Sequence, residues 1–349
     1  MTYLPTFKQI WQILGLGILL APILLYNIPY FLRPEQTNEA RSLFQGIAYR
    51  REFRTNPRPT LIHILSIDLK APGIGIFVTP GNPTPDLTET NARTATEFLK
   101  EFKLQLAVNG NFFYPCIEKA PWDYYPRSGD RVNNVGHAIA KSQAYSQPDP
   151  GFPAFCFDAK NRAQIIENGT CPAGTAYAVA GDTLLVKNGK PVAQSQEERK
   201  QDKPYPRAVV AIDKTGGKLW LILVDGKQRL YSEGLKLSEI TDISMQLGAE
   251  TVLNLDGGGS VTFAVASPSG AKLLNAPIQN KIPMQERPIS NHLGFYARDN
   301  YGFKFHFNNK LRQGISRLVR KSLSLYKKLE NPMGAVWYFI HHYNESLHI

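Results

Sequence analysis

The run Asn254–Ser260, which reads Asn-Leu-Asp-Gly-Gly-Gly-Ser, holds the residues whose types and spacing most readily do chemistry. The apolar stretch Thr251–Leu255 predicts a buried strand that ends directly at Asp256. The glycines Gly257–Gly259 permit positive φ angles and a close approach of the backbone to a ligand. Their N–H groups and the Ser260 hydroxyl would form an anion-binding turn. A carboxylate beside such a turn predicts an Asp that handles a proton or a developing cation while the turn holds a phosphate.

Two other interpretations of this run need weighing. A tight β-turn, whose Asp bonds only its own backbone, fits the same seven residues when they are taken alone. A Walker phosphate-binding loop does not fit, because no Gly-Lys-Ser or Gly-Lys-Thr follows the glycines. The choice between an active-site turn and a plain turn therefore depends on what else the chain brings to this place.

Five further polar residues stand at the ends of predicted strands. Asn109 follows a buried strand, and its amide offers both a donor and an acceptor to a sugar or a phosphate. Arg207 begins a strand after Pro-Tyr-Pro, and its planar guanidinium suits phosphate oxygens. Asp225 ends the next strand, while Arg287 and Asn291 stand at a later strand entrance. Each residue alone is also consistent with an ordinary turn or a solvated edge, so their combination carries the argument.

Six segments, taken in order, resemble a known family. They read Val-Asn-Gly-Asn-Phe-Phe (108–113), Ala-Gly-Asp-Thr-Leu-Leu-Val-Lys-Asn-Gly-Lys (180–190), Pro-Arg-Ala-Val-Val-Ala-Ile (206–212), Val-Asp-Gly-Lys (224–227), Leu-Gly-Ala-Glu-Thr-Val-Leu-Asn-Leu-Asp-Gly-Gly-Gly-Ser (247–260) and Glu-Arg-Pro-Ile-Ser-Asn (286–291). The set resembles the phosphodiester glycosidase family over roughly residues 60–297. The resemblance implies hydrolysis of a sugar–phosphate diester at its glycosidic bond.

The resemblance also implies roles for the residues above. Asp256 and Asn109 would be catalytic. Asp256 would stabilise an oxocarbenium-like transition state or activate water, and Asn109 would orient the sugar or the water. The substrate and its phosphate would be held by Arg207, Gly257, Gly258, Gly259, Ser260, Asp225, Arg287 and Asn291.

The chain departs from the family pattern at two positions. Asp182 stands where the family usually has a second Gly, and Ala208 stands where a hydroxyl residue commonly follows the Arg. The Asp182 departure is a hint toward a rival class, a non-catalytic module that binds a glycan or the cell envelope on the same fold. Turnover of a sugar 1-phosphodiester would separate this class from a hydrolase.

The elements that must position these residues predict one α+β domain over residues 60–298. Alternating and apolar runs predict strands at 61–70, 75–79, 104–108, 177–186, 207–212, 219–224 and 251–255. A helix is expected at 91–102 with Thr88 or Thr90 as N-cap, and another at 238–247 between Ser238 and Gly248. We therefore expect a mixed, mostly antiparallel twisted sheet with flanking helices.

The N-terminal residues 1–32 predict a membrane segment. Residues 10–32 are almost free of charge and long enough to cross a bilayer, and no small-residue cleavage site follows them. An uncleaved anchor is favoured over a signal peptide, and a buried core helix is the third alternative. Residues 33–59 are rich in Arg, Pro and Asn and predict a juxtamembrane linker, with a short helix around Glu39–Ile47.

Residues 299–349 predict a basic amphipathic tail. Residues 301–349 hold eight Lys or Arg against two acids, about half of the chain's formal net charge of +11. An apolar stripe from Leu311 to Leu329 predicts a helix that lies on anionic lipid or, alternatively, docks on the domain. We do not expect nucleic acid as a partner; if it were, binding would survive deletion of residues 60–297.

The three cysteines leave the compartment open. Cys116, Cys156 and Cys171 match no zinc-site spacing, and either one disulfide with a spare thiol or three thiols is consistent with them. We expect no cofactor, although a divalent metal is not ruled out by sequence. The combined expectation is a membrane-anchored, exported hydrolase, periplasmic or extracellular, that acts on a phosphodiester-linked envelope glycan, exopolysaccharide or glycolipid.

Overall fold

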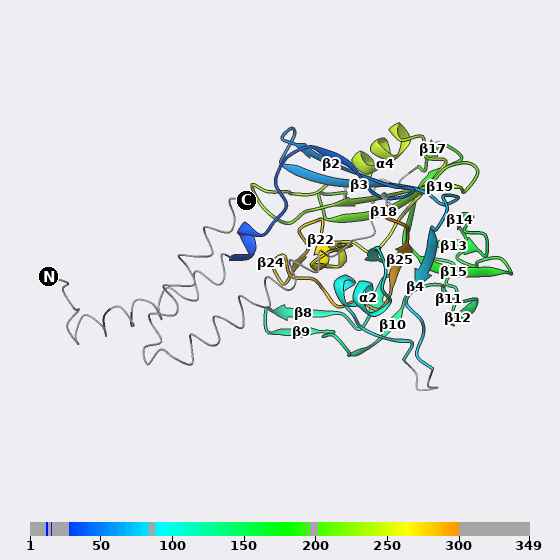
Figure 1. Cartoon of the computed structure of the whole chain (residues 1–349), viewed down its shortest axis with the longest axis horizontal. Coiled ribbons are helices and arrows are strands. Elements are labelled where there is room, and N and C mark those ends of the chain that lie inside the picture. The colour runs from blue at the N-terminus through cyan, green and yellow to red at the C-terminus, as the bar shows by residue number, and fades with distance from the viewer. Residues whose placement is uncertain are drawn as a thin grey trace, which may run out of the picture. The chain divides into compact units, whose positions relative to one another are not determined.

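The computed structural model describes residues 12, 15, 28–83, 88–193, 195 and 202–299. Within these ranges the chain is built mainly from antiparallel β-sheets, with few helices (Figure 1). The predicted antiparallel character of the sheet is confirmed. The expected parallel contribution is wrong for this part of the chain, because each strand pair found there is antiparallel.

An eight-stranded sheet forms the largest layer. Its strands in spatial order are β1 (Glu39–Phe44), β2 (Ile47–Arg54), β3 (Thr60–Asp68), β19 (Lys218–Val224), β18 (Arg207–Ile212), β20 (Thr251–Asn254), β16 (Thr183–Lys187) and β17 (Lys190–Pro191). The central strands β3, β18, β19 and β20 were predicted within two residues of their ends, because they are long apolar runs. This sheet delivers Arg207, Asp225 and Asp256 to strand ends or to the residues that follow them.

Two five-stranded sheets and several short ladders make up the rest of the described fold. The first sheet has the order β22 (Gly270–Leu273), β21 (Phe263–Ser267), β6 (Leu106–Asn109), β25 (His292–Tyr296) and β4 (Gly75–Val78). The second has the order β12 (Gln143–Ser146), β11 (Ala138–Ala140), β15 (Thr175–Ala180), β13 (Ala154–Asp158) and β14 (Ala163–Ile166). The short ladders are β5 (Thr90–Asn91) with β10 (Arg131–Asn134) and β7 (Phe113–Tyr114), β8 (Ile117–Ala120) with β9 (Asp123–Tyr125), and β23 (Ile278–Gln279) with β24 (Ile282–Pro283).

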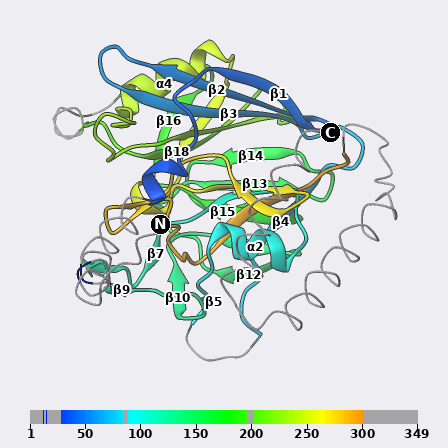
Figure 2. The same cartoon turned by 60° about the vertical axis from the view of Figure 1, so that its left-hand side comes forward.

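The eight-stranded sheet is buried on both faces. Along β19, Leu219, Leu221 and Leu223 belong to the main core cluster, which also takes side chains from both five-stranded sheets. Trp220 and Ile222 belong to a second cluster on the opposite face, which is completed by helix α4 (Leu237–Gln246). Successive side chains of a strand point to opposite faces, so one apolar run supplies two cores. Figures 1 and 2 both show α4 on the outer side of this sheet.

The predicted helix at 91–102 is shorter than expected. Helix α2 spans Ala95–Glu101, and its N-cap is Thr94 instead of Thr88 or Thr90. The Thr94 hydroxyl accepts the N–H of Glu97 at 3.2 Å, while the Glu97 carboxylate accepts the N–H of Thr94 at 2.8 Å. This reciprocal capping box fixes the helix start. Residues 90–91 are consequently available for β5, which pairs with β10.

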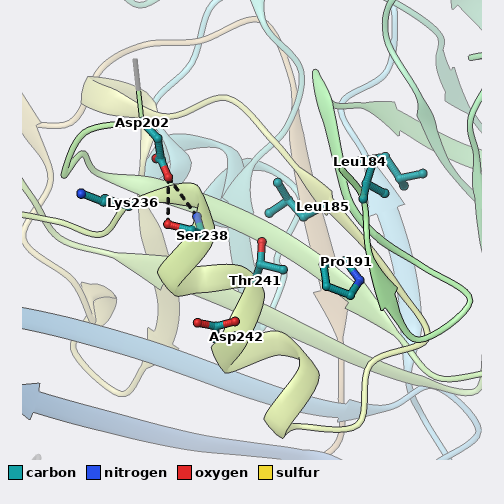
Figure 3. Close-up of a pocket in the computed structure, with 9 residues that line it drawn as sticks. Leu184, Leu185, Pro191, Asp202, Lys236, Ser238, Thr241 and Asp242 are labelled. Atoms are coloured by element: carbon teal, nitrogen blue, oxygen red, sulfur yellow. Dashed lines mark hydrogen bonds between the residues drawn. The ribbon is translucent and has the colours of Figure 1, made fainter. Parts of the chain in front are cut away.

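The second predicted helix, 238–247, is confirmed as α4, but its N-terminal partner differs. Asp202 accepts the N–H of Leu237 at 2.6 Å. The same carboxylate accepts the N–H and the hydroxyl of Ser238, at 3.1 and 2.9 Å (Figure 3). A carboxylate at this position satisfies orphan N–H groups and interacts favourably with the helix dipole. Ser238 therefore lies inside the first turn, and a distant Asp performs the capping expected of it.

Residues 39–54 correct the prediction of a linker over 33–59 and of a short helix at Glu39–Ile47. They form the antiparallel pair β1 and β2, and β2 continues into the sheet through β3. The buried side chains of Ile47 and Tyr49 alternate with exposed ones, as a half-buried strand requires. Arg50, one of the arginines that suggested a linker, is exposed on a strand and forms an ion pair with Glu52 at 2.9 Å.

The two predicted terminal segments lie largely outside the described ranges. This holds for the membrane segment at 1–32, of which 12, 15 and 28–32 are described, and for the basic tail at 299–349 beyond residue 299. In the described part of the chain, no helix combines the length and the apolar character that a membrane span needs. Both segments stay predictions.

The cysteines adopt the first of the two expected arrangements. Cys156 on β13 forms a disulfide with Cys171, while Cys116 is free and exposed. The bonded pair packs with Ile139, Ala154 and Ala178 in a small apolar cluster of the second five-stranded sheet. The crosslink therefore joins β13 to the loop before β15.

Candidate active site

Asp256 lies where the eight-stranded sheet meets the sheet that contains β6. It is the second residue after β20, and its side chain is buried, with 8% exposed. Its carbonyl accepts the Asn109 amide at 2.6 Å, and its N–H donates to the carbonyl of Gly110 at 3.4 Å. The ends of β20 and β6 are thereby tied together. The structure thus brings two of the predicted site segments into contact.

The glycine turn after Asp256 is a short 3-10 helix, η1 (Gly258–Ser260). Gly258 has φ +62°, and a Cβ at this position would lie 2.9 Å from the Tyr205 hydroxyl, so glycine is required on both counts. The N–H of Gly258 donates to the Pro206 carbonyl at 3.0 Å. The N–H of Ser260 donates to the Gly257 carbonyl at 3.2 Å. These two N–H groups therefore hold the turn itself together, which leaves fewer of them for an anion than the sequence predicted.

Arg287 is the arginine that reaches the turn. Its Nη1 donates to the Ser260 hydroxyl at 3.1 Å, its Nε donates to Gln279 at 2.8 Å, and its Nη2 bonds to Glu118. Burial lowers the pKa of Arg287, but the charges of Cys116, Glu118 and Asp256 outweigh it and raise the pKa above its ordinary value. Arg287 is 9% exposed. A buried, fixed guanidinium of this kind is suited to bind a phosphate next to Ser260.

Asp256 is electrostatically unusual. Burial raises the pKa of its carboxyl to about 6, against the opposing effects of a hydrogen bond with Ser260 and the charge of Arg287. The charge of Asp182 adds a smaller upward contribution. A carboxyl that titrates near neutral pH exchanges a proton with little driving force in either direction, which suits a general acid or base. Such a shift supports a catalytic interpretation of the Asp.

The Arg207 guanidinium contacts groups outside the glycine turn. Its Nη2 is 3.9 Å from the Asp202 carboxylate, and its guanidinium donates to the carbonyls of Leu235 and Lys203 at 3.5 and 3.4 Å. Burial lowers the pKa of Arg207, while Asp202 and Asp182 counteract it. No bond from Arg207 to Ser260 or to the glycine turn occurs among the described contacts. Its electrostatic link to the site runs through Asp182.

Asp182 is the departure from the family pattern, and it borders the site. Its carboxylate accepts the Asn254 amide at 2.8 Å, and burial raises the pKa of the carboxyl above its ordinary value. Asn254 lies two residues before Asp256 on β20. The position thus adds a second buried carboxylate whose charge acts on Asp256.

Asn109, Asn291 and Asp225 are fully buried and hold the loops around the site together. Asn109 and Asn291 are 0% exposed and Asp225 is 1% exposed. The Asn109 amide donates to the Asp256 carbonyl at 2.6 Å and accepts the N–H of Thr262 at 3.4 Å. Asn291 accepts the N–H of Asn111 at 2.8 Å, and Asp225 accepts the N–H of Ala276 at 3.0 Å. Each of these three side chains therefore bonds to the backbone of another segment.

The sequence reasoning missed several residues at the site. Glu118, Gln279 and Tyr205 contact Arg287 or pack against the glycine turn, and none of them was singled out. Glu118 lies in the turn-rich segment 114–175, where no strand was predicted. The sequence does point to Tyr205, because it lies between Pro204 and Pro206, just before Arg207.

A separate hollow of about 410 Å³ lies beside α4 (Figure 3). Leu184, Leu185 and Thr241 line it, with Asp202 at its rim, and the Asp202 carboxylate is occupied in capping the helix. Asp256, Ser260 and Arg287 do not line this hollow. We place the candidate site at Asp256 and not at this hollow, because the raised pKa of Asp256 and the contact between Arg287 and Ser260 occur together there. In the part of the chain that is described, His, Cys, Asp and Glu side chains form no group of three or more arranged for a metal ion.

The family model described as phosphodiester glycosidase matches residues 102–296, more than half of the chain. No match is found among curated proteins.

Two solved structures are similar in fold. A hypothetical protein from Synechocystis aligns with a TM-score of 0.54 at 16% identity, covering 75% of this chain and 64% of its own. The catalytic domain of zebrafish N-acetylglucosamine-1-phosphodiester alpha-N-acetylglucosaminidase, auto-inhibited by its pro-peptide, aligns with a TM-score of 0.51 at 19% identity, covering 75% and 88%. The present chain thus spans less than two thirds of the Synechocystis protein. At these identities the likeness shows the fold.

Proposed function

The chain belongs to the phosphodiester glycosidase family, and on that premise we propose that it hydrolyses the glycosidic bond of a sugar–phosphate diester. The observation that carries the proposal is the buried Asp256, whose pKa is raised to about 6, beside the Arg287–Ser260 pair. One group is suited to proton transfer, and the other two are suited to bind an anion. Asp256 would act at the sugar side of the bond, and Arg287 and Ser260 would bind its phosphate.

The proposed reaction breaks the bond between the anomeric carbon and the phosphate oxygen. Arg287 and Ser260 hold the phosphate, which leaves with the bonding electron pair as a monoester and needs little protonation. The ionised Asp256 accepts a proton from a water molecule while the oxygen of that water adds to the anomeric carbon. Alternatively, Asp256 stabilises the oxocarbenium-like transition state. The products are a free sugar and a phosphate monoester.

The other residues assigned from sequence take positioning roles in this proposal. Asn109 fixes the backbone of Asp256, and the glycines bring the chain around so that Ser260 faces Arg287. Arg207 acts on the site through Asp182, whose charge contributes to the raised pKa of Asp256. Arg287 thus takes the phosphate-binding role that the sequence assigned mainly to Arg207.

An isotope experiment tests which bond is cleaved. The protein is incubated with an activated sugar 1-phosphodiester in ¹⁸O-labelled water, and the products are weighed by mass spectrometry. We expect the label in the sugar and none in the phosphate monoester. Label in the phosphate would show attack at phosphorus and would contradict the proposal.

Matched variants test the role of Asp256. Asp256→Asn is expected to lower kcat by about 10²- to 10⁴-fold, the range typical of a lost general acid or base. Asp242→Asn, an exposed position on α4, should leave kcat unchanged. Substrate binding without turnover in the unmodified protein would favour the alternative, a glycan- or envelope-binding module on the same fold.

The expected cellular setting is also part of the proposal. We propose a membrane-anchored, exported enzyme that acts on an envelope glycan or glycolipid. The apolar residues 10–32 and the Cys156–Cys171 disulfide support it, since disulfides persist in oxidising compartments. Fractionation of cells that express the full chain tests it: recovery in the membrane fraction, with protease sensitivity from the outer side, is the expected result.

A further inference from the structure

A second hollow, of about 420 Å³, lies next to the candidate active site. Its walls come from hairpin β8–β9, from Lys227 and from hairpin β23–β24. Figure 1 shows the two hairpins extending toward the same side of the molecule. Three lysines line the hollow, Lys119, Lys227 and Lys281, and all three are exposed to solvent. The lining thus carries three positive charges.

The hollow has one acidic residue, and that residue is engaged. Glu118 lines the wall, and its carboxylate bonds to the Arg287 guanidinium. Solvent ions screen charges over about 8 Å at physiological salt. Charges that line one hollow therefore add up in their effect on a molecule bound in it. Since Glu118 is paired, the three lysines dominate the local field.

Two residues that line the hollow, Glu118 and Lys227, contact residues of the candidate site. Glu118 connects it to Arg287, which bonds to Ser260. On the other side, the Lys227 ammonium lies 4.3 Å from the ring centroid of Tyr205, whose hydroxyl packs against Gly258. A molecule whose phosphate lies at Arg287 and Ser260 therefore has this hollow directly beside it.

Two of the three lysines have backbone conformations that normally favour glycine. Lys227 has φ +57° and Lys281 has φ +65°. Asn280 precedes Lys281 with φ +51°, so both central residues of the β23–β24 turn are left-handed. Glycine is the usual second residue of such a turn, and a lysine there is strained. Strain kept at one place points to a function for the side chain.

The hollow also contains an unused hydrogen-bond donor. The Nδ2 atom of Asn280 is buried and has no hydrogen-bond partner among the described residues. Asn280 is part of the lining. A buried amide nitrogen without a partner is costly, and an oxygen of a bound ligand would satisfy it.

We propose that this hollow is the subsite for the aglycone, and that it binds an anionic group of the alcohol esterified to the scissile phosphate. The bound group is a second phosphate or a carboxylate, held by Lys119, Lys227 and Lys281 and accepting from the Asn280 amide. The proposal rests on the proposed hydrolase function. It adds that the enzyme prefers a polyanionic substrate to a neutral one with the same sugar.

A substrate pair tests the preference. One sugar 1-phosphodiester carries a neutral alkyl alcohol, and the other carries the same alcohol ending in a phosphate. We expect a higher kcat/KM for the anionic substrate, and we expect Lys281→Gln and Lys227→Gln each to lower the anionic-to-neutral ratio by about threefold. Salt should lower the ratio for the unmodified protein.

Lys103→Gln is the matched control, because Lys103 is also exposed and left-handed, with φ +54°, but does not line the hollow. The anionic-to-neutral ratio of kcat/KM for Lys103→Gln should equal that of the unmodified protein. An unchanged ratio in both hollow variants would overturn the subsite while leaving the hydrolase proposal intact. If neither substrate is hydrolysed, the hydrolase proposal fails, and inorganic triphosphate provides the test of the hollow by calorimetry. Equal affinity of the unmodified protein and Lys281→Gln for triphosphate would then overturn the anion site.

Discussion

Replacing Asp256 by Asn should make the protein more stable at neutral pH while removing its activity. The raised pKa of the Asp256 carboxyl means that the folded state resists its ionisation. The unfolded chain ionises at an ordinary Asp pKa, so ionisation favours unfolding. An amide cannot ionise, and the variant therefore avoids this cost. A residue retained at the expense of stability is a mark of a functional site.

The size of the effect follows from the pKa. A carboxyl whose pKa rises from 3.8 to about 6 costs the folded state about 3 kcal/mol once it is fully ionised. The Asn side chain loses the attraction between the carboxylate and Arg287, so we reduce the expected gain to about 1 to 3 kcal/mol. For a folded unit of this size, this corresponds to a rise in Tm of roughly 3 to 8 °C.

The sign of the pH dependence is specific. At pH 4, Asp256 is protonated in the folded state and only about half ionised in the unfolded chain, where its pKa is 3.8, so the Tm values of the two proteins should differ much less than at neutral pH. The contribution of the protonated Asp256 to stability is lost as the pH rises through about 6, the pKa of the folded state. Above about pH 7 the difference between Asp256→Asn and the unmodified protein should be constant and at its largest.

Thermal unfolding at pH 4, 6 and 8, followed by circular dichroism, measures the difference directly. Asp242→Asn serves as control and should show little change at any of the three pH values, since Asp242 is exposed. An equal Tm shift for Asp256→Asn at pH 4 and pH 8 would show that ionisation is not the cause. A lower Tm at pH 8 would refute the reasoning, because the carboxylate would then stabilise the fold.

Three further substitutions probe the surroundings of Asp256. Gly259→Ala should lower kcat/KM by about 10- to 100-fold, because its Cβ would lie 2.5 Å from Nη2 of Arg287 and displace the guanidinium from Ser260; steady-state kinetics equal to those of the unmodified protein would remove Arg287 from phosphate binding. Asn109→Ala should lower the free energy of unfolding by about 1 to 3 kcal/mol in urea titration, since the Asp256 carbonyl loses a 2.6 Å hydrogen bond; a loss below about 0.5 kcal/mol would contradict a positioning role. Lys281→Gly should raise that free energy by about 0.5 to 1 kcal/mol, because glycine adopts φ +65° without strain; a decrease would mean that Lys281 is not strained.

The sequence predicted the central sheet well because its strands are long and apolar. β18 and β19 carry uninterrupted runs of apolar residues that fill a core on each face, and no polar alternative competes with burial. β1 and β2 were missed because their outward positions carry arginine and glutamate, which hide the alternating buried residues. The strands between 113 and 166 are two to five residues long and depend on distant partners for their pairing, so local pattern gives little signal.

The sequence predicted that the ends of β20 and β6 meet, but it did not predict which arginine contacts the glycine turn. The turn after β20 and the asparagine that ends β6 do come together, as their positions at strand ends suggested. Residue type could not distinguish Arg287 from Arg207, because both follow a short polar or proline-rich segment and offer the same guanidinium. What separates them is the partner each guanidinium meets, Ser260 in one case and Asp202 in the other. That pairing depends on long-range packing.

The fully buried polar residues give a physical reason for the placement of the site. A carboxyl such as Asp256 keeps a raised pKa only if water stays away from it and its backbone cannot move toward solvent. Asn109 holds that backbone directly, and Asn291 and Asp225 fix the loops at 111 and 276. The side chains that suggested catalysis (Asn109) or substrate binding (Asn291 and Asp225) thus hold the backbone segments around Asp256. Changes to Asn109, Asn291 or Asp225 should therefore alter stability and the pH profile of turnover together. Removal of the Arg287 charge, which lowers the pKa of Asp256, should lower turnover and shift that profile to higher pH.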